Sequence, residues 1–408
     1  MKCYIYENKC AGDFEPLSLT RPAFDLRCGP FTFLERLLKL IPEPADVSLI
    51  VRENLANLTR EMYPDLEVNP GDAEEGIWLL GNVFWRESDL QQIAKTSSGV
   101  FHSKNMQIGA NLSQKEGIDW LNAGGPVATD LHFEIPTMNL RSIPVNYLWE
   151  ILQKIPWIME EDTRHFPKRN ENDIIDKNLQ VINPRNVWIE EPNKIKPAVV
   201  IDASKGSVII EKNVEIGPFS FLKGPLFIGN RTIVSPHSQI KESVLGPVCR
   251  VGGEVERTII QGWSNKVHDG HLGDAFLGEW VNLGAGTNNS NLKNNYTPVE
   301  VTVNGKIIDT ESLFIGSFIG DHSKTAIGTQ LNTGTLIGPG CNIVSKGFPP
   351  RYIQPFIWFM NGKRISTKIE KFIETAETVK SRRGMSFSGA ERELFEALFI
   401  QRKKIPAI

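Results

Sequence analysis

The residues from Ser264 to Asn295 have side chains that could carry out chemistry, and they lie close together in the chain. This stretch, SNKVHDGHLGDAFLGEWVNLGAGTNNSNLKNN, combines histidines, aspartates and amides with glycine-spaced aliphatic residues. We expect His268 to act as a general base, because an exposed imidazole titrates near neutral pH. Asp269 and His271 leave a second hypothesis open, since histidines and carboxylates also bind zinc or iron.

A six-residue repeat surrounds this stretch and must position it. Aliphatic residues recur in register at Ile189, Ile195 and Ile201 and then at Ile210, Ile216, Leu222, Ile228, Val234 and Ile240. Each hexapeptide forms a short strand and a turn, and stacked coils of such strands make a parallel β-helix. The pattern resumes at Leu272, Leu277 and Leu283, and later at Ile315, Ile327, Ile337 and Ile343. These side chains are expected to point inward, which leaves His268 at a surface.

The repeat is interrupted between Thr287 and Leu313. Within the interruption, VEVTVNGKIIDT has two strand-like runs joined by Asn304-Gly305, which predicts a hairpin. Such an insert is expected to lie over a binding site. Farther on, the aromatic and proline-rich FPPRYIQPFIWF is expected to leave the β-helix and pack across its outside. Helices are expected at residues 369–380 and 390–399.

The first half of the chain alternates strands and helices. Strands are predicted at residues 2–6, 47–51 and 78–80, and helices near residues 31–38, 55–62 and 147–158. This order is typical of a parallel α/β sheet, whose ligands bind at the carboxyl ends of the strands.

The loop between the first strand and the first helix contains two arginines. Arg21 and Arg27 precede the N-terminus of that helix, where phosphate groups are favoured. Phosphate binding by these guanidinium groups is one hypothesis. The other is that Asp25 forms a salt bridge with an arginine and ties the loop together.

The composition limits the classes of partner. The chain has 408 residues and a formal charge of −3, and its Lys and Arg residues are scattered. We therefore expect neither a nucleic-acid nor a membrane partner. No signal peptide is recognisable, and no window reaches the ~18 apolar residues of a membrane span. The five scattered cysteines indicate reduced thiols rather than disulfides or a metal site. A cytoplasmic location is expected.

The central stretch resembles the acetyltransferase half of bifunctional N-acetylglucosamine-1-phosphate uridyltransferase/glucosamine-1-phosphate acetyltransferase, a family with the pattern H-x3-L-G-D-x3-G-x2-V-N-I-G-A-G-T. The matching residues are His268, Leu272-Gly273-Asp274, Gly278 and Val281-Asn282-Leu283-Gly284-Ala285-Gly286-Thr287. The resemblance implies a left-handed β-helix, a homotrimer and acetyl-CoA as a substrate. It also implies that His268 deprotonates the amine that attacks the thioester.

The same resemblance implies residues that bind the substrates. The implied sugar and sugar-phosphate contacts are Asn282, Asn291, Lys223 and Lys241, and the implied acyl-CoA contacts are Ala285 and Ser317. Lys223 stands where the family has an arginine, which keeps the charge but loses the forked geometry. Leu292 and His271 replace two family tyrosines beside the sugar.

The first half resembles the divergent bacterial sugar-nucleotidyltransferase-like proteins, which carry the signature L-T-x-T-R-P…D-L-R-x-G. Here the loop has LSLTRPAFDLRCG. The resemblance implies that Arg21 and Arg27 bind the phosphates of an NTP or a nucleotide sugar. Standard enzymes hold a divalent metal with an aspartate where this chain has Asn82, and an amide lacks that charge. Mg²⁺ is thus expected where another carboxylate, such as Asp72 or Asp89, takes over.

The patterns and resemblances together predict the organisation of the chain. We expect a Rossmann-like, nucleotidyltransferase-like α/β domain over residues 1–165, a linker over 166–186, a left-handed β-helix over 187–347, and a C-terminal extension with helices over 348–408. The expected function is transfer of an acetyl or other acyl group from acyl-CoA to an amino-sugar phosphate or nucleotide amino sugar. Nucleotidyl transfer to a sugar-1-phosphate would take place in the first domain.

Other classes of function remain open at this stage. One is a nucleotidyltransferase whose β-helix serves to trimerise the chain. Another is a non-catalytic protein that binds sugar nucleotides. The third is a β-helix metallo-hydratase of the carbonic anhydrase type, in which His237 or His322 would complete the ligand set.

Overall fold

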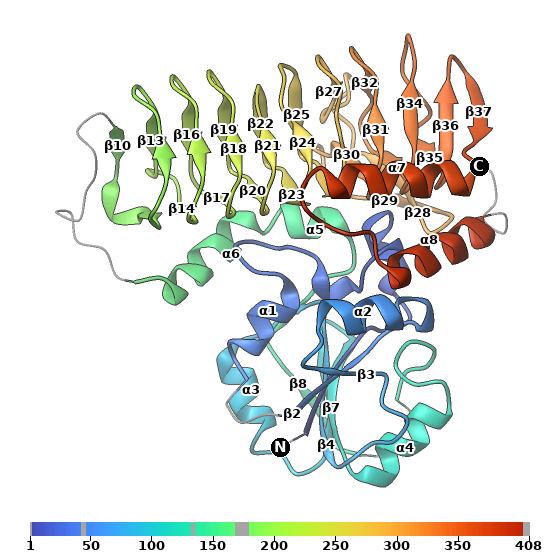
Figure 1. The fold of residues 1–408 in the computed structure, drawn as a ribbon. Helices are drawn as coiled ribbons and strands as arrows, with labels where there is room; N and C mark the ends of the chain where they lie inside the picture. Colours follow the sequence, from blue (N-terminus) through green and yellow to red (C-terminus); the bar gives the residue numbers. More distant parts are fainter. Residues whose placement is uncertain (1, 42–45, 132–134, 168–178, 403–408) are drawn as a thin grey trace.

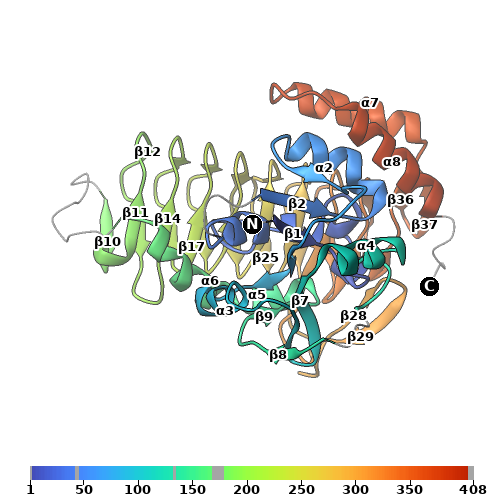
Figure 2. The same ribbon diagram turned by 90° about the horizontal axis from the view of Figure 1, so that it is seen from below.

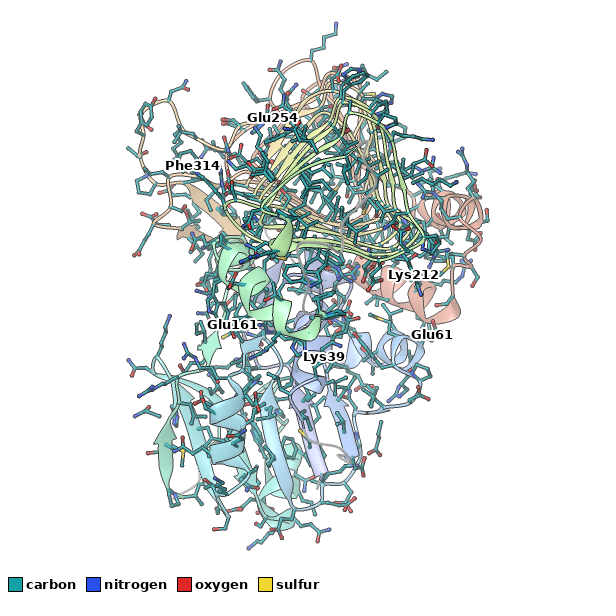
Figure 3. The ribbon with its side chains drawn as sticks, turned by 90° about the vertical axis from the view of Figure 1, so that its left-hand side faces the viewer. Lys39, Glu61, Glu161, Lys212, Glu254 and Phe314 are labelled. Atoms are coloured by element: carbon teal, nitrogen blue, oxygen red, sulfur yellow. The ribbon has the colours of Figure 1, made fainter. Side chains whose placement is uncertain are left out.

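The six-residue repeat forms a three-sided parallel β-helix that lies along one side of an α/β domain (Figure 1). The computed structural model describes residues 2–41, 46–131, 135–167 and 179–402. Seen from its end, the β-helix has a triangular outline, with the α/β domain beneath it (Figure 3). Across the described ranges, no helix is both long and apolar enough to cross a membrane.

The α/β domain has a seven-stranded mixed sheet with the order β3-β2-β1-β4-β7-β6-β8. Its strands are β1 (Lys2–Tyr6), β2 (Asp46–Ile50), β3 (Glu67–Val68), β4 (Gly76–Leu80), β6 (Gly99–Ser103), β7 (Met106–Leu112) and β8 (Thr137–Asn139), and a separate pair is formed by β5 (Val83–Phe84) and β9 (Ile143–Pro144). Its helices are α1 (Phe33–Leu38), α2 (Ala56–Met62), α3 (Glu87–Ile93), α4 (Gln114–Asn122), α5 (Leu148–Leu152) and α6 (Ile155–Asp162). The strands and helices predicted in the first half are confirmed, except that the single helix expected near residues 147–158 is divided into α5 and α6. The sheet is also mixed and not purely parallel, because β7 runs antiparallel to β4 and β6.

We name the three faces of the β-helix by what lies against them. The outer face contains β10 (Gln180–Ile182), β13 (Val200–Asp202), β16 (Phe221–Lys223), β19 (Gln239–Lys241), β22 (Glu254–Glu256) and β25 (His271–Gly273), followed by β27 (Asn288–Asn289) and β32 (Gln330–Leu331). The domain face contains β11 (Val187–Ile189), β14 (Val208–Ile210), β17 (Leu226–Ile228), β20 (Val244–Leu245), β23 (Ile259–Gly262), β26 (Phe276–Glu279), β30 (Ser317–Ile319), β33 (Thr335–Ile337) and β35 (Tyr352–Ile353). The helix face contains β12 (Lys194–Ile195), β15 (Glu215–Ile216), β18 (Ile233–Val234), β21 (Arg250–Val251), β24 (Asn265–Lys266), β31 (Lys324–Thr325), β34 (Asn342–Val344), β36 (Ile357–Met360) and β37 (Lys363–Ser366).

The repeated aliphatic side chains fill the interior of the β-helix as predicted. The inward residues include Ile210, Ile216, Leu222, Ile228, Val234, Ile240, Leu272, Leu277 and Leu283, each at most 4% exposed. Ile327 is an exception, because it lies in the turn between β31 and β32 and is 82% exposed. Ile315 also departs from the pattern, since it joins the core of the α/β domain.

The segment FPPRYIQPFIWF forms the last coil instead of leaving the β-helix, so that prediction is wrong. β35 and β36 continue the domain and helix faces, and their residues Ile353 and Phe359 point inward. The alternation of inward and outward residues in each strand outweighs the prolines, which lie in turns. At the other end, β10 lies inside the expected linker, of which residues 168–178 fall outside the described ranges.

A second apolar stripe runs along the outside of the domain face. Its members are in register and comprise Ile209, Phe227, Val244, Ile259, Phe276, Phe318, Leu336 and Tyr352. All of them belong to the same buried cluster as the sheet and helices of the α/β domain, and the rings of Trp149 and Phe318 are 6.0 Å apart. Successive strand residues point to opposite sides, so one strand can serve both cores. The two units therefore share a continuous core.

The interruption of the repeat contains the predicted hairpin, formed by β28 (Glu300–Val303) and β29 (Lys306–Asp309). Asn304 and Gly305 have φ values of 48° and 73°, as a two-residue type I′ turn requires. Val301 and Val303 pack into the core shared with the α/β domain, and Asn304 Nδ2 donates to Asp13 Oδ1 at 3.2 Å. The hairpin thus contacts the first domain.

The two predicted C-terminal helices are confirmed as α7 (Ile369–Ser381) and α8 (Gly389–Gln401). They pack on each other through Phe372 and Phe395, whose rings are 4.9 Å apart. α8 also packs against α2, where Asn57 Nδ2 donates to Glu393 Oε2 at 2.8 Å (Figure 2). The helices therefore connect the β-helix to the first domain.

Candidate functional site

His268 lies at the corner between the helix face and the outer face, in the turn that joins β24 to β25. Its side chain is exposed, and the imidazole makes no hydrogen bond with any residue that the structure describes. An imidazole without a protein partner is available to a substrate amine. This position suits a general base, and that role stays a prediction.

Lys266 lies beneath this corner and was not singled out from the sequence. It takes an inward position on β24, opposite Val251, and is 2% exposed. Its Nζ donates to the backbone oxygens of His268 at 2.5 Å and Gly252 at 3.0 Å. Burial lowers the pKa of Lys266 to about 8. The sequence could have indicated its importance, because Lys266 occupies a position of the repeat that usually has an aliphatic residue.

Ala285 and Asn282 lie one coil beyond His268. The two coils are joined by a hydrogen bond from Gly286 N to the oxygen of Asp269 at 3.2 Å, so Ala285 follows His268 along the same corner. Asn282 lies on the helix face, where its Oδ1 accepts a hydrogen bond from Asn265 Nδ2 at 3.1 Å. The structure thus brings three predicted site residues to one edge of the β-helix.

The other predicted sugar and phosphate contacts lie at the corner between the outer and domain faces. Lys223 and Lys241 end neighbouring strands in register. Asn291 follows β27, and its Nδ2 donates to Asp274 Oδ2 at 2.6 Å. The strand β25 separates this corner from His268. Within one chain, these residues and His268 do not meet.

Ser317 points away from the surface of the β-helix. It lies on β30 of the domain face and is 0% exposed. Its side chain is on the same side of the strand as Ile319, which points into the β-helix. The side chain therefore faces the interior of the coil and not the surface, and the predicted acyl-CoA contact stays a prediction.

Arg21 and Arg27 hold the α/β domain to the β-helix. Arg21 is 4% exposed and pairs with Asp321 at 2.7 Å and with Asp25 at 3.1 Å. The alternative hypothesis of a salt bridge to Asp25 is thereby confirmed. Arg27 donates from its backbone N to Gln261 Oε1 at 2.9 Å and from Nε to Gln261 O at 3.3 Å. Both arginines have protein partners, and their binding of phosphate stays a prediction.

The carboxyl ends of β1 and β4 are occupied by the domain's own side chains. Glu7 is 0% exposed, pairs with Arg52 at 2.9 Å and accepts from Ala23 N at 2.8 Å. Asn82 follows β4 and donates from Nδ2 to the oxygen of Val145 at 2.7 Å. Glu7 is neutralised by Arg52 and Asn82 is uncharged, so these residues do not fit a divalent cation such as Mg²⁺.

Neither of the carboxylates considered as replacements lies at these strand ends. Asp89 is on α3, and its Oδ2 accepts hydrogen bonds from Ser142 N and Oγ, both at 2.6 Å. Asp72 precedes β4 and so lies near the amino end of that strand. The described residues also bring no three His, Cys, Asp or Glu side chains together as a metal site. His237 instead stacks on Phe219, with ring centroids 5.2 Å apart.

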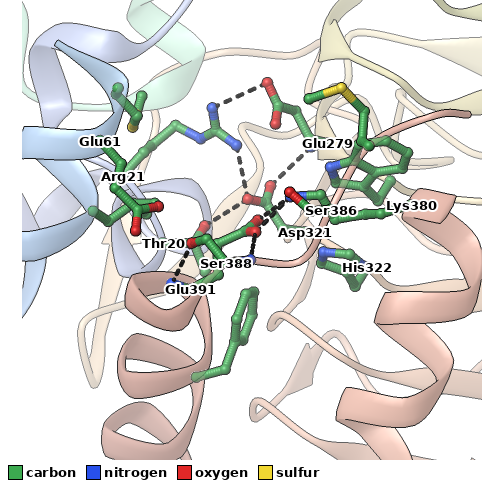
Figure 4. A pocket seen from close by; sticks show the side chains of 15 residues that line it. Thr20, Arg21, Glu61, Glu279, Asp321, His322, Lys380, Ser386, Ser388 and Glu391 are labelled. Atoms are coloured by element: carbon green, nitrogen blue, oxygen red, sulfur yellow. Dashed lines mark hydrogen bonds and ion pairs between the residues drawn. The ribbon is translucent and has the colours of Figure 1, made fainter. Parts of the chain in front are cut away.

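A cavity of about 350 Å³ lies where the α/β domain, the β-helix and the C-terminal helices meet (Figure 4). Asp321 holds one side of it together, because its carboxylate accepts from Thr20 Oγ1 at 2.8 Å, Arg21 Nη2 at 2.7 Å and Glu279 N at 2.8 Å. His322 is 3% exposed, and its Nδ1 has no hydrogen-bond partner. The repeat pattern gave no indication of this junction.

The buried imidazole of His322 predicts a pH dependence of stability. Burial, followed by the charges of Lys324, Lys380 and Arg21, lowers the pKa of His322 well below its usual range. Below about pH 6.5 the unfolded chain therefore binds a proton that the folded chain does not. This difference costs the folded state up to about 1.4 kcal/mol for each further pH unit.

The variant His322→Phe keeps an aromatic ring beside the neighbouring aromatic side chains and removes the imidazole that can be protonated. Between pH 7 and pH 5, urea unfolding should show a larger loss of stability for the wild type than for the variant. Burial also raises the pKa of Glu15 to about 7 and that of Asp25 to about 6. Protonation of these two carboxyls favours the folded state as the pH falls, but it does so equally in the wild type and in the variant. If the stabilities of the wild type and the variant changed in parallel with pH, His322 would not be the cause of the pH dependence.

The architecture and the site define the class of the protein: an α/β nucleotidyltransferase-like domain joined to a hexapeptide β-helix, with a helical C-terminal tail. Residues 3–171 match the protein-family model described as "Sugar nucleotidyl transferase". The resemblance to divergent proteins of the bifunctional nucleotidyltransferase/acetyltransferase type is confirmed by two curated relatives. A "Bifunctional sugar-1-phosphate nucleotidylyltransferase/acetyltransferase" of Sulfurisphaera tokodaii is 35% identical over 137 residues, 33% of this chain and 34% of that protein.

The second relative is a "Bifunctional protein GlmU" of Methanococcus aeolicus. It is 30% identical over 214 residues, which are 50% of this chain and 47% of that protein. The chain thus matches less than two thirds of the length of either relative. A solved structure of Francisella novicida UDP-N-acetylglucosamine acyltransferase matches with 14% identity and a TM-score of 0.25, over 52% of this chain and 72% of that one.

Proposed function

We propose that the β-helix transfers an acetyl or other acyl group from acyl-CoA to the amine of an amino-sugar phosphate or nucleotide amino sugar. The amine nitrogen attacks the thioester carbonyl, and its proton passes to the imidazole of His268. The carbon–sulfur bond then breaks, and the CoA thiolate leaves and takes up a proton. The product carries a new amide bond.

One observation carries this proposal: the unpartnered imidazole of His268 lies at an exposed corner, above the buried amine of Lys266. The hydrogen bond from Lys266 Nζ fixes the backbone at His268 and so orients the base. Ala285, in the next coil along the same corner, leaves room beside the imidazole because its side chain is a single methyl group. The similarity to the nucleotidylyltransferase/acetyltransferase of Sulfurisphaera tokodaii supports the same chemistry.

A second copy of the chain would complete the site. Lys223, Lys241 and Asn291 lie at a different corner from His268, so in a homotrimer one chain's phosphate-binding corner would face the neighbour's base. Sedimentation equilibrium should then give a trimer. A purely monomeric protein that still transfers acyl groups would contradict this arrangement.

The proposed function is tested by incubating the purified protein with acetyl-CoA and a panel of amino-sugar phosphates and nucleotide amino sugars. Mass spectrometry should detect a product heavier by one acetyl group, together with free CoA. Sugars with a hydroxyl in place of the amine are the matched controls and should give no product. The absence of an acylated product from every amine would refute the proposal.

Nucleotidyl transfer in the α/β domain is a second candidate, favoured by the family match over residues 3–171. Its test is the release of pyrophosphate from NTP and sugar-1-phosphate pairs in the presence of Mg²⁺. Release would establish the activity. Failure with every pair would leave the domain as a binding or structural module, in keeping with the side chains that occupy the ends of β1 and β4.

A further inference from the structure

A second cavity, of about 410 Å³, lies between the helix face of the β-helix and the C-terminal end of α7. Its cationic residues come from both elements: Arg250 and Lys324 from the β-helix, and Arg382 and Arg383 from the end of α7. Its volume is in the range of small-molecule sites, which is roughly 300–1,000 Å³. The sequence alone does not bring these four residues together.

The four cations, which we call the basic cluster, lack acidic partners. None of them forms an ion pair with a residue inside the described ranges, and no described Asp or Glu lines the cavity. By contrast, the buried Lys380 pairs with Glu391 at 2.5 Å and the buried Arg21 pairs with Asp321 at 2.7 Å. In the basic cluster, Arg250 and Arg382 are exposed and Lys324 and Arg383 are half-buried, so all four can be reached by a ligand.

The surroundings of two members of the cluster, Arg383 and Lys324, disfavour their charged forms. Burial, followed by repulsion from Arg250, lowers the pKa of Arg383, and burial lowers that of Lys324. Like charges that share a partly desolvated cavity repel one another. A bound anion would relieve this repulsion, and guanidinium groups bind phosphate oxygens in a forked geometry.

Several polar groups of the cavity are already held in place by hydrogen bonds. Arg383 donates to Asn265 Oδ1 at 2.9 Å and to the oxygen of Val248 at 3.2 Å, and Asn265 donates to Asn282 at 3.1 Å. Trp263 and Trp280 stack beside them with ring centroids 4.9 Å apart. A site with fixed donors loses little conformational freedom when a ligand binds.

A purely structural explanation accounts for half of the cluster. The C-terminal end of a helix attracts cations, which explains Arg382 and Arg383 at the end of α7. It does not explain Arg250 and Lys324, which come from coils of the β-helix that face this helix end. Without an anion, bringing them together would be unfavourable.

We propose that the basic cluster binds the pyrophosphate group of a phosphorylated small molecule. The pyrophosphate belongs either to a nucleotide sugar or to a CoA-type nucleotide, and both present the same charges. The basic cluster lies on the helix face and shares only Asn282 with the residues predicted for acyl transfer, so pyrophosphate binding can be tested independently of that reaction. With a CoA-type ligand the inference rests on the proposed function and locates part of the donor site.

The test is isothermal titration of the full-length protein with inorganic pyrophosphate at low ionic strength. Binding should be saturable and should weaken as salt is added. The double variant Arg250→Gln/Lys324→Gln should weaken binding by about tenfold or more, the effect of losing at least one charge-assisted hydrogen bond. Titrations with a UDP-sugar and with CoA then show which source binds more tightly.

Two further variants keep the proposal falsifiable. Arg382→Ala changes an exposed residue for which no folding defect is expected, and it should also weaken pyrophosphate binding. Lys212→Gln removes an exposed cation that does not line the cavity and should leave binding unchanged. No binding by the wild type, or equal affinity in all variants, would overturn the proposal. His268→Ala should retain pyrophosphate binding, so failure of the acyl-transfer proposal is distinguishable.

Discussion

Replacing His268 with alanine is expected to lower kcat for acyl transfer by about 10²–10⁴-fold, the usual contribution of a positioned general base. The side chain is exposed and makes no hydrogen bond with the described residues, so its removal should not disturb the β-helix. Steady-state assays with the acceptor found by mass spectrometry measure the effect. KM should change much less than kcat, because the imidazole acts on the proton transferred during the reaction.

The matched control for this prediction is His237→Ala. His237 is an exposed histidine of the same β-helix that stacks on Phe219. It should keep full activity, which separates a catalytic role from a general effect of losing a surface imidazole. Full activity of His268→Ala would remove this residue as the base.

Lys266→Met tests whether Lys266 positions the imidazole of His268. The substitution removes the hydrogen bond to the backbone of His268 but leaves the imidazole in the chain. We expect a lower kcat with the general-base limb of the pH profile retained, whereas His268→Ala should abolish that limb.

Replacing Asp321 with alanine is expected to destabilise the protein by about 1.5–3 kcal/mol, because the buried Arg21 loses its nearest carboxylate and keeps only Asp25 at 3.1 Å and Glu279 at 3.5 Å. The side chains of Arg21 and Asp321 are 5% and 7% exposed, and their atoms are 2.7 Å apart. The substitution also leaves Glu279 N without its acceptor, whereas Thr20 Oγ1 can still donate to Leu17 O at 3.2 Å. Urea unfolding at neutral pH should show a lower midpoint.

The double variant Arg21→Met/Asp321→Leu tests the physical cause. Removing both charges should restore part of the stability, since apolar side chains can replace a buried ion pair at little net cost, although the buried Asp25 then loses its partner Arg21. The control is Glu374→Ala, which breaks an exposed pair with Lys371 and should change stability by less than about 0.5 kcal/mol. A similarly small effect of Asp321→Ala would show that this ion pair does not hold the two units together.

The sequence by itself determined the β-helix, the α/β domain and the hairpin at Asn304-Gly305. Each of these follows from a local pattern: a six-residue period, an alternation of strands and helices, and a turn that needs two positive φ values. Neighbouring coils pair in order along the chain, so the period alone defines which residues point inward. His268 could be placed at a surface for the same reason.

Tertiary structure decided which partners surround Arg21, Arg27 and Ser317. In the sequence the arginines resemble phosphate ligands, but Asp321 and Gln261, which they contact, are hundreds of residues away. Ser317 is hidden because the strand that carries it turns this side chain inward. The basic cluster likewise exists because α7 returns to the helix face. A local pattern describes what a residue can do, whereas the partner that uses its charge or covers its surface comes from a distant segment of the folded chain.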